Sequence, residues 1–502
     1  MAPSVTHPLD LSEIRVLISQ YLPKKDALAC TQVSKDWAKD FARPIWHTID
    51  FKVHKTFLEL GADTIQKYSH YILAVKNISL QSHLDVLQGI DAHQLRCIAA
   101  TMNRDSQFHK DCYDLIRRNN TTLTRISLSL QFSKSKTSYT APLEAILPDP
   151  ITLCTPSKLT HLILESHVLS RASLSTLLRG CPALTSLDLW NSQVRANEDG
   201  TLDDFRHEGI KQLVSKVQGF IFVEPTLPED RRSLLVHFPN LKVLSTYSHH
   251  QDTLPITELR DEIRRWCPRL KSLYTNNSPS PVVAQLLVQG FERLTVLHFS
   301  YDAVSAEIFL AIETHQRTMT SVTAAVPFSA FYESREVRAV EGDVLADAGW
   351  MAQRVPQRCD QLEEFWLPEH AMTMEDVEKR EWKCRGLKDL RVRIRGLDVA
   401  ERIEGVIAAL GIRMRTKRKA KTMKSESIGT KGVDAESDQS DKREQDSSVI
   451  HDNKKMEQAD EEGSQEKERV VALSPLEERV VEHLLQFDRL KILWLGTSIH
   501  HL

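Results

Sequence analysis

The sequence predicts an α/β solenoid, and three observations support this fold class: a recurring phrase, its near-constant spacing, and a packing residue ahead of it. The phrase is L-x-x-L-x-L, in which Val, Ile, Phe, Met or a small residue sometimes replaces Leu. It begins at Val75, Leu123, Leu159, Leu184, Val217, Leu241, Leu270, Leu294, Met319, Leu362, Leu387 and Leu490. Several neighbouring starts lie 24 or 25 residues apart, as at 159 and 184 or 270 and 294.

A period of about 20–29 residues built on this phrase is typical of leucine-rich repeats. Such repeats stack one strand each into a horseshoe with a long concave binding surface. A Cys or Phe stands three residues ahead of many phrases, at Cys181, Phe238, Cys267, Phe291, Cys359, Cys384 and Phe487. Both residue types are often buried, so this slot predicts a core position. Amphipathic stretches between the phrases, such as Ile256–Trp266, predict helices.

Composition indicates a soluble globular protein. The chain has 502 residues, 41% hydrophobic and 26% charged, with a net charge of −3, which gives no overall attraction to nucleic acid or membrane. The N-terminus lacks the pattern of a signal peptide, and no apolar stretch reaches the ~18 residues of a membrane span. Eight cysteines in so long a chain fit free thiols in a reducing compartment. We therefore expect a cytoplasmic or nuclear location, or both.

The repeats are expected to occupy residues 75–412, with a last repeat at 470–502. Between them, residues 413–469 open with a basic run, turn acidic and contain no aromatic residue, so we expect this insertion to be disordered. The basic run resembles a nuclear localisation signal, and it is equally compatible with the solvated flank of a loop. Without interleaved aromatic residues it offers no platform for stacking nucleic-acid bases.

A separate helical module is expected over residues 7–51, followed by a linker at 52–74. A first helix is predicted to end at Pro23. Its apolar face consists of residues that recur at helical spacing: Ile14, Leu17, Ile18, Tyr21 and Leu22. Asp26 is the expected N-cap of a second helix and Ser34 that of a third, which carries Trp37 and Phe41. Three helices in about forty residues bury little core, so such a module needs a partner or a neighbouring domain.

Residues His7–Phe51 resemble the F-box. The similarity rests on Leu11-Ser12-Glu13-Ile14, Ile18, Tyr21-Leu22, Asp26, Leu28, Val33-Ser34-Lys35, Trp37 and Ile45-Trp46. The family usually has proline where Ser12 stands and often cysteine where Ser34 stands. The resemblance implies docking onto a Skp-type adaptor within an SCF-type cullin-RING ubiquitin ligase, with the repeats selecting the substrate protein. The alternative is a module that serves only as the cap of the solenoid.

Seven residues are the candidates for adaptor binding: Leu11, Ile14, Ile18, Leu22, Leu28, Val33 and Trp37. Their division between the core of the module and its docking surface stays open at this point. Candidates for substrate binding come from the third, fifth and seventh positions of the phrase, because side chains alternate along a strand and these positions face outward. They are Trp190, Tyr247, Tyr274, His298, Trp366, Arg391 and Trp494. Aromatic side chains in a concave groove are typical interface anchors, unless flanking loops cover them.

Motifs of common enzymes are missing. The sequence contains no G-x-x-x-x-G-K-[ST], no H-E-x-x-H and no G-x-S-x-G, and no C-x-x-C spacing for a zinc site. We therefore expect no catalytic residues, metal or cofactor. The prediction is a substrate receptor for a ubiquitin ligase, and the alternative is a leucine-rich-repeat scaffold that is not linked to ubiquitin transfer.

Overall fold

The computed structural model of the protein describes most of the chain. The described residues are 7–90, 92–103, 105–130, 157–190, 192–195, 205–216, 234–247, 256–276, 280–300, 304–325, 351–379, 381–397, 402, 405–411, 413–414, 473–487, 489–495 and 498–501. The chain divides into two compact units. Unit 1 comprises Met1–Met319 with Ala325–Glu333, and unit 2 comprises Thr320–Ala324 with Ser334–Leu502.

Unit 1 begins with a module of three helices, after a short 3-10 turn at Pro8–Asp10: α1 (Ser12–Ser19), α2 (Lys24–Cys30) and α3 (Lys35–Trp46). Ser34 caps α3 as predicted, since its Oγ accepts a hydrogen bond from the Trp37 amide at 3.2 Å. The predicted N-cap at Asp26 is wrong. Because α2 begins directly after Pro23, Asp26 lies in its first turn, where its charge favours the helix N-terminus instead.

Parallel strands, one for each repeat, form the sheet of unit 1. Their order is β1-β2-β3-β4-β5-β7-β9-β10-β11-β12. The bounds are β1 Thr48–Asp50, β2 Ala74–Ile78, β3 Cys97–Met102, β4 Arg125–Leu130, β5 His161–Glu165, β7 Ser186–Trp190, β9 Gln212–Lys216, β10 Val243–Tyr247, β11 Ser272–Asn276 and β12 Val296–Ser300. Strands β6 (Val168–Ser170) and β8 (Gln193–Arg195) form a separate parallel pair. The stack confirms a repeat solenoid of mixed α/β type.

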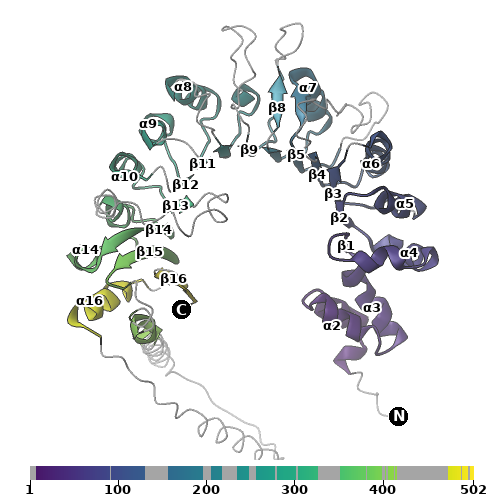
Figure 1. Ribbon diagram of the computed structural model, residues 1–502, viewed down its shortest axis with the longest axis horizontal. Coiled ribbons are helices and arrows are strands. Elements are labelled where there is room, and N and C mark those ends of the chain that lie inside the picture. Colours follow the sequence, from purple (N-terminus) through teal and green to yellow (C-terminus); the bar gives the residue numbers. More distant parts are fainter. Residues whose placement is uncertain are drawn as a thin grey trace, which may run out of the picture. The chain divides into compact units, whose positions relative to one another are not determined.

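Helices connect these strands and run along their outer side (Figure 1). They are α4 Ala62–Tyr68, α5 Gln81–Gly89, α6 Ser106–Arg118, α7 Arg171–Gly180, α8 Ile256–Trp266, α9 Ser280–Gly290 and α10 Ala306–Glu313, with 3-10 turns at Lys55–Glu59, Ser69–Tyr71 and Leu234–His237. Helix α8 has the bounds that its amphipathic pattern predicts.

The core of each repeat lies between its strand and its helix. In β7, for example, Leu187 and Leu189 are buried while the residues between them are half-buried on the other face. The Cys or Phe slot is buried as predicted at Cys181, Phe238, Cys267, Cys359, Cys384 and Phe487. Phe291 departs from this pattern and is half-buried. All four cysteines of the slot are free thiols.

Two of the predicted phrase starts are out of register. Val75 pairs with Ile98 and thus holds the fourth position of its phrase, so that repeat starts at the buried Ile72. Similarly, Leu213 of β9 pairs with Leu244, which places the start at Ile210 and not at Val217.

Unit 2 contains β13 (Ser321–Ala325), β14 (Glu364–Thr373), β15 (Asp389–Arg395) and β16 (Ile492–Leu495) in parallel, and β17 (Ser498–His501) antiparallel to β16. Its helices are α13 (Arg354–Arg358), α14 (Met374–Lys379) and α16 (Pro475–Leu484). Strands β15 and β16 pair directly, although the sequence between them holds the predicted insertion. That insertion, 413–469, lies outside the described residues except for 413 and 414.

Candidate protein-interaction surfaces

Five large apolar side chains of the helical module are exposed, and together they are here called the module face. Their exposed fractions range from 46% to 80%: Leu11, Leu17, Tyr21, Leu28 and Val33. Leu11 precedes α1, and the others lie in α1, in α2 or in the turns after these helices. Large apolar side chains that remain exposed in such numbers on a small module mark a candidate interaction site.

A buried ion pair joins α1 to α3. Arg15 is buried and pairs with Asp40 of α3, with 2.6 Å between Nε and Oδ2. The same Asp40 accepts from the Ser12 hydroxyl at 2.7 Å, and Arg15 also donates to the Leu9 carbonyl at 2.8 Å. Because Arg15 and Ser19 of α1 are buried, Leu17 on the opposite side of this helix is exposed, whereas Ile14 and Ile18 are half-buried.

The predicted adaptor residues fall into two groups in this arrangement. Leu11, Leu28 and Val33 are exposed and belong to the module face, while Ile14, Ile18, Leu22 and Trp37 are half-buried. Trp37 stacks on the buried Phe41 with 5.3 Å between ring centroids. The adaptor candidates from the sequence did not include Leu17 and Tyr21, although both belong to the apolar helix face that the spacing predicted; in the structure Tyr21 follows α1, which ends at Ser19.

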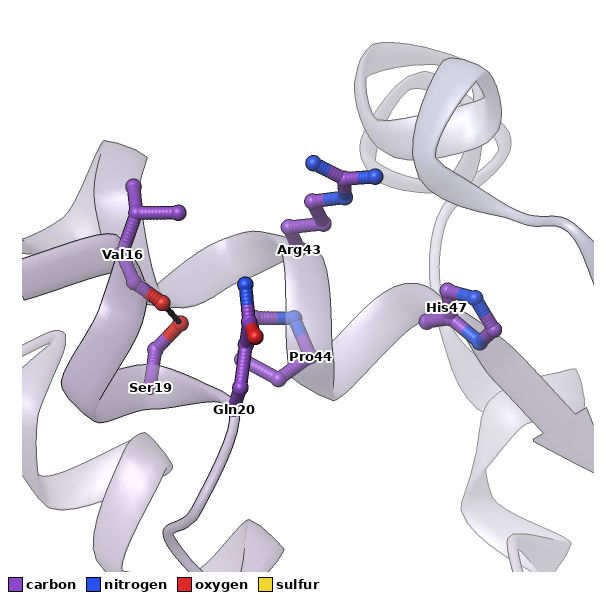
Figure 2. Close-up of a pocket in the computed structure, with 6 residues that line it drawn as sticks. All are labelled: Val16, Ser19, Gln20, Arg43, Pro44 and His47. Atoms are coloured by element: carbon purple, nitrogen blue, oxygen red, sulfur yellow. Dashed lines mark hydrogen bonds between the residues drawn. The ribbon is translucent and has the colours of Figure 1, made fainter. Parts of the chain in front are cut away.

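A pocket of about 360 Å³ lies between α1 and α3 (Figure 2). It is lined by Val16, Ser19, Gln20, Arg43, Pro44 and His47. Its volume is at the small end of the range for ligand sites. Burial, followed by the charge of Arg43, lowers the pKa of His47 from its usual value. The polar groups of this lining include the guanidinium of Arg43, the imidazole of His47 and the hydroxyl of Ser19, which donates to the Val16 carbonyl at 2.8 Å.

The second surface, here called the strand face, consists of the third, fifth and seventh positions of each phrase. In unit 1 it includes Trp190, Tyr274 and His298, all of which are half-buried. Tyr274 and His298 occupy paired positions on β11 and β12, and their rings stack with centroids 5.5 Å apart. Tyr247 is paired with Asn276 on the same face, and its side chain lies outside the described part of the structure.

In unit 2 the strand face is built around Arg391. Two hydrogen bonds of 3.0 and 2.9 Å hold its guanidinium on the Asp389 carboxylate. The guanidinium lies 3.6 Å from the ring centroid of Trp366, which is the paired residue on β14. Trp494 follows in register on β16, and its side chain lies beyond what the structure describes. The bidentate pair and the cation–π contact fix Arg391 in one orientation.

Two carboxylates lie on the strand face of β5 and β7. Burial, followed by the nearby Glu165 carboxylate, raises the pKa of Asp188 to about 6. The Oδ1 atom of Asp188 is buried and accepts no hydrogen bond from the described residues. A carboxyl group in this setting is therefore less stable when it is ionised.

We expect Asp188→Asn to raise the thermal unfolding midpoint of the protein at pH 7.5. The folded-state pKa lies above the unfolded value of about 3.8, so ionised Asp188 destabilises the fold at neutral pH. Protonation removes this penalty as the pH falls from about 6 to about 4, and the advantage of the variant should disappear over the same range. Thermal unfolding at several pH values measures this, with the exposed Glu292→Gln as the control. A pH-independent difference would contradict the prediction.

Metal binding and membrane spanning receive no support from the described residues. Within them, no three His, Cys, Asp or Glu side chains are placed to hold a metal ion. None of the described helices has the length and apolar character needed to cross a membrane.

No protein-family model matches the chain, and no curated protein matches it either. Among solved structures, it is similar to the Rad7–Elc1 complex of yeast, with 11% sequence identity, a TM-score of 0.34, and coverage of 77% of this chain and 89% of that chain. It is also similar to the mouse RP105/MD-1 complex, with 10% identity, a TM-score of 0.26, and coverage of 66% of this chain and 43% of that chain. At these scores the similarity carries no argument about this chain, whose fold follows from the strand pairing described above.

Proposed function

We propose that the protein is a substrate receptor of an SCF-type cullin-RING ubiquitin ligase. In this function, the three-helix module at residues 7–51 is an F-box that docks onto a Skp-type adaptor, and the strand face binds the substrate protein. The protein itself performs no chemistry, and it raises the effective concentration of the substrate near a bound ubiquitin-conjugating enzyme.

The module face is the observation that carries this proposal. Five large apolar side chains remain exposed in a module whose α1 and α3 are joined by the buried Arg15–Asp40 pair. A helical cap that served only the solenoid would turn its apolar side towards the first repeat. The outward direction of this face therefore supports a separate protein partner.

Co-purification tests the proposal. The full chain, produced together with a Skp-type adaptor and a cullin, should elute with both as one complex, and this complex should assemble ubiquitin chains when it is supplied with a conjugating enzyme. Elution of the chain without the adaptor at micromolar concentrations would refute the receptor function and leave a leucine-rich-repeat scaffold. Affinity purification with the proteasome blocked, followed by mass spectrometry, would identify the substrate.

We expect Tyr274→Ala and Trp366→Ala each to weaken substrate capture by at least ~2 kcal/mol, the usual threshold of an interface hot spot. Tyr274→Ala removes the ring that stacks on His298, and Trp366→Ala removes the ring that lies under Arg391. Binding of the captured substrate to purified variants measures the effect, and adaptor binding should not change. Equal substrate affinity for both variants and the parent would exclude the strand face as the site.

A further inference from the structure

Three neighbouring strands of unit 1 are each preceded by a lysine. Lys211, Lys242 and Lys271 each stand directly before a strand, at the second position of the phrase. Their backbones are stacked, because the Lys242 amide donates to the Lys211 carbonyl at 2.7 Å and the Lys271 amide donates to the Lys242 carbonyl at 2.9 Å. Neighbouring strands are about 4.8 Å apart, so the three lysines extend from one short edge of the sheet.

These lysines have no acidic neighbour in their own row. The positions on either side are Thr185 and Thr295, which continue the same series of backbone hydrogen bonds. All three lysine side chains are exposed, and none has an ion pair within 4.0 Å among the described residues. Like charges that face each other across neighbouring strands destabilise a sheet, so this row costs stability in the isolated protein.

In unit 2, a lysine at the same position of the phrase is paired with a carboxylate. There, Lys388 stands directly before β15 and stacks on Glu363, which stands before β14. The Lys388 ammonium group lies 2.6 Å from the Glu363 carboxylate. A lysine at this position can therefore be paired within the fold, and the row in unit 1 lacks that pairing.

On these three strands, the outward residues that follow the lysines are Gln212, Val243 and Ser272, and then Val214, Ser245 and Tyr274. Tyr274 lies three residues after Lys271, and its ring stacks on His298 of the neighbouring β12. An extended segment that continued from Lys271 along β11 would reach this pair of rings.

We propose that Lys211, Lys242 and Lys271 form a docking site for an acidic segment of a protein, rich in closely spaced Asp or Glu. The three lysines supply complementary charge, and Tyr274 with His298 supplies the adjoining apolar contact. That the segment belongs to a substrate of the ligase rests on the proposed function. That the lysines bind such a segment does not. Charge complementarity of this kind increases the rate of encounter and makes the affinity depend on salt.

Fluorescence anisotropy with a labelled twelve-residue peptide of alternating Glu and Ser tests the site on the full chain. We expect the peptide to bind, its affinity to fall as salt rises, and a peptide of alternating Gln and Ser to bind at least tenfold more weakly. Changing Lys211, Lys242 and Lys271 together to Gln should weaken binding of the Glu peptide at least tenfold, whereas changing them to Arg should retain it. The matched control changes Lys67, Lys110 and Arg264 to Gln, which removes the same charge from helices α4, α6 and α8.

The proposal would be overturned if the parent did not bind the Glu peptide, or if the Lys→Gln variant and its control bound the peptide equally. It would also be overturned if the parent bound a twelve-nucleotide oligothymidine more tightly than the Glu peptide, which would indicate a nucleic-acid site. Adaptor co-purification with the Lys→Gln variant separates this proposal from the proposed function. If the Lys→Gln variant loses peptide binding but still binds the adaptor, the lysine site is supported whether or not the protein acts in a ligase. If the parent does not bind the adaptor, only the ligase function is refuted.

Discussion

Changing Leu28 and Val33 together to Asp should abolish capture of a Skp-type adaptor. These side chains are 54% and 63% exposed, so they make few contacts within the module and their replacement should leave its fold intact. In a complex they would be buried, and each new carboxylate would then lie in an apolar interface without a partner. Two hot-spot losses of about 2 kcal/mol each predict that the affinity falls at least about a hundredfold. Titration of the purified adaptor by calorimetry measures the change.

A matched control is available on the helices of the repeats. Val288 and Leu310, on α9 and α10, are 50% and 48% exposed, so changing both to Asp adds the same charge to a comparable surface. This control should bind the adaptor like the parent. Undiminished binding by the Leu28 and Val33 variant, with its thermal midpoint unchanged, would show that the module face is not the adaptor site.

Asp40→Ala should unfold the helical module. Asp40 and Arg15 keep only 8% of each side chain exposed, so removal of the carboxylate leaves a buried guanidinium without its counter-charge. Breaking a buried ion pair in this way costs about 3–5 kcal/mol, which is as much as so small a core supplies. Hydrogen exchange should report fast exchange at α1 and α3, while the strands of the repeats stay protected because each repeat contacts only its neighbours.

A double variant separates the loss of this pair from the loss of packing. Arg15→Met combined with Asp40→Leu replaces both charges by apolar groups, which is often neutral or stabilising for a buried pair. It should therefore recover the protection that Asp40→Ala loses. Equal protection of α1 in Asp40→Ala and in the parent would mean that the pair does not hold the module together.

Repeat spacing and the Cys or Phe slot predicted the solenoid because both follow from a single packing rule. Each phrase must bury the same positions against its neighbours, so the pattern is visible in one sequence. The rule is weaker where small residues fill the phrase. Strand β3 has Ala100 and strand β9 has Ser215 at the sixth position of the phrase, so the sequence pattern missed the repeat of β3 and misplaced the start of the repeat of β9.

The candidate sites were less predictable because they depend on contacts between distant residues. The apolar spacing identified a helix face, but only the structure shows that Leu17 and Tyr21 of this face are exposed while Ile14, Ile18 and Leu22 are half-buried. Likewise, alternation along β14 and β15 places Trp366 and Arg391 on one side, whereas their stacking depends on the register between the two strands.

The reversal of the chain at β17 bears on self-assembly. An open edge of a sheet exposes unpaired amide and carbonyl groups, which recruit a strand from a second molecule and start linear polymers. Here, residues Ser498–His501 pair antiparallel with Ile492–Leu495 and occupy the groups that β16 would otherwise offer. Because this returning strand opposes the direction of the stack, a second copy cannot add its first parallel strand to β16 and extend the array from molecule to molecule.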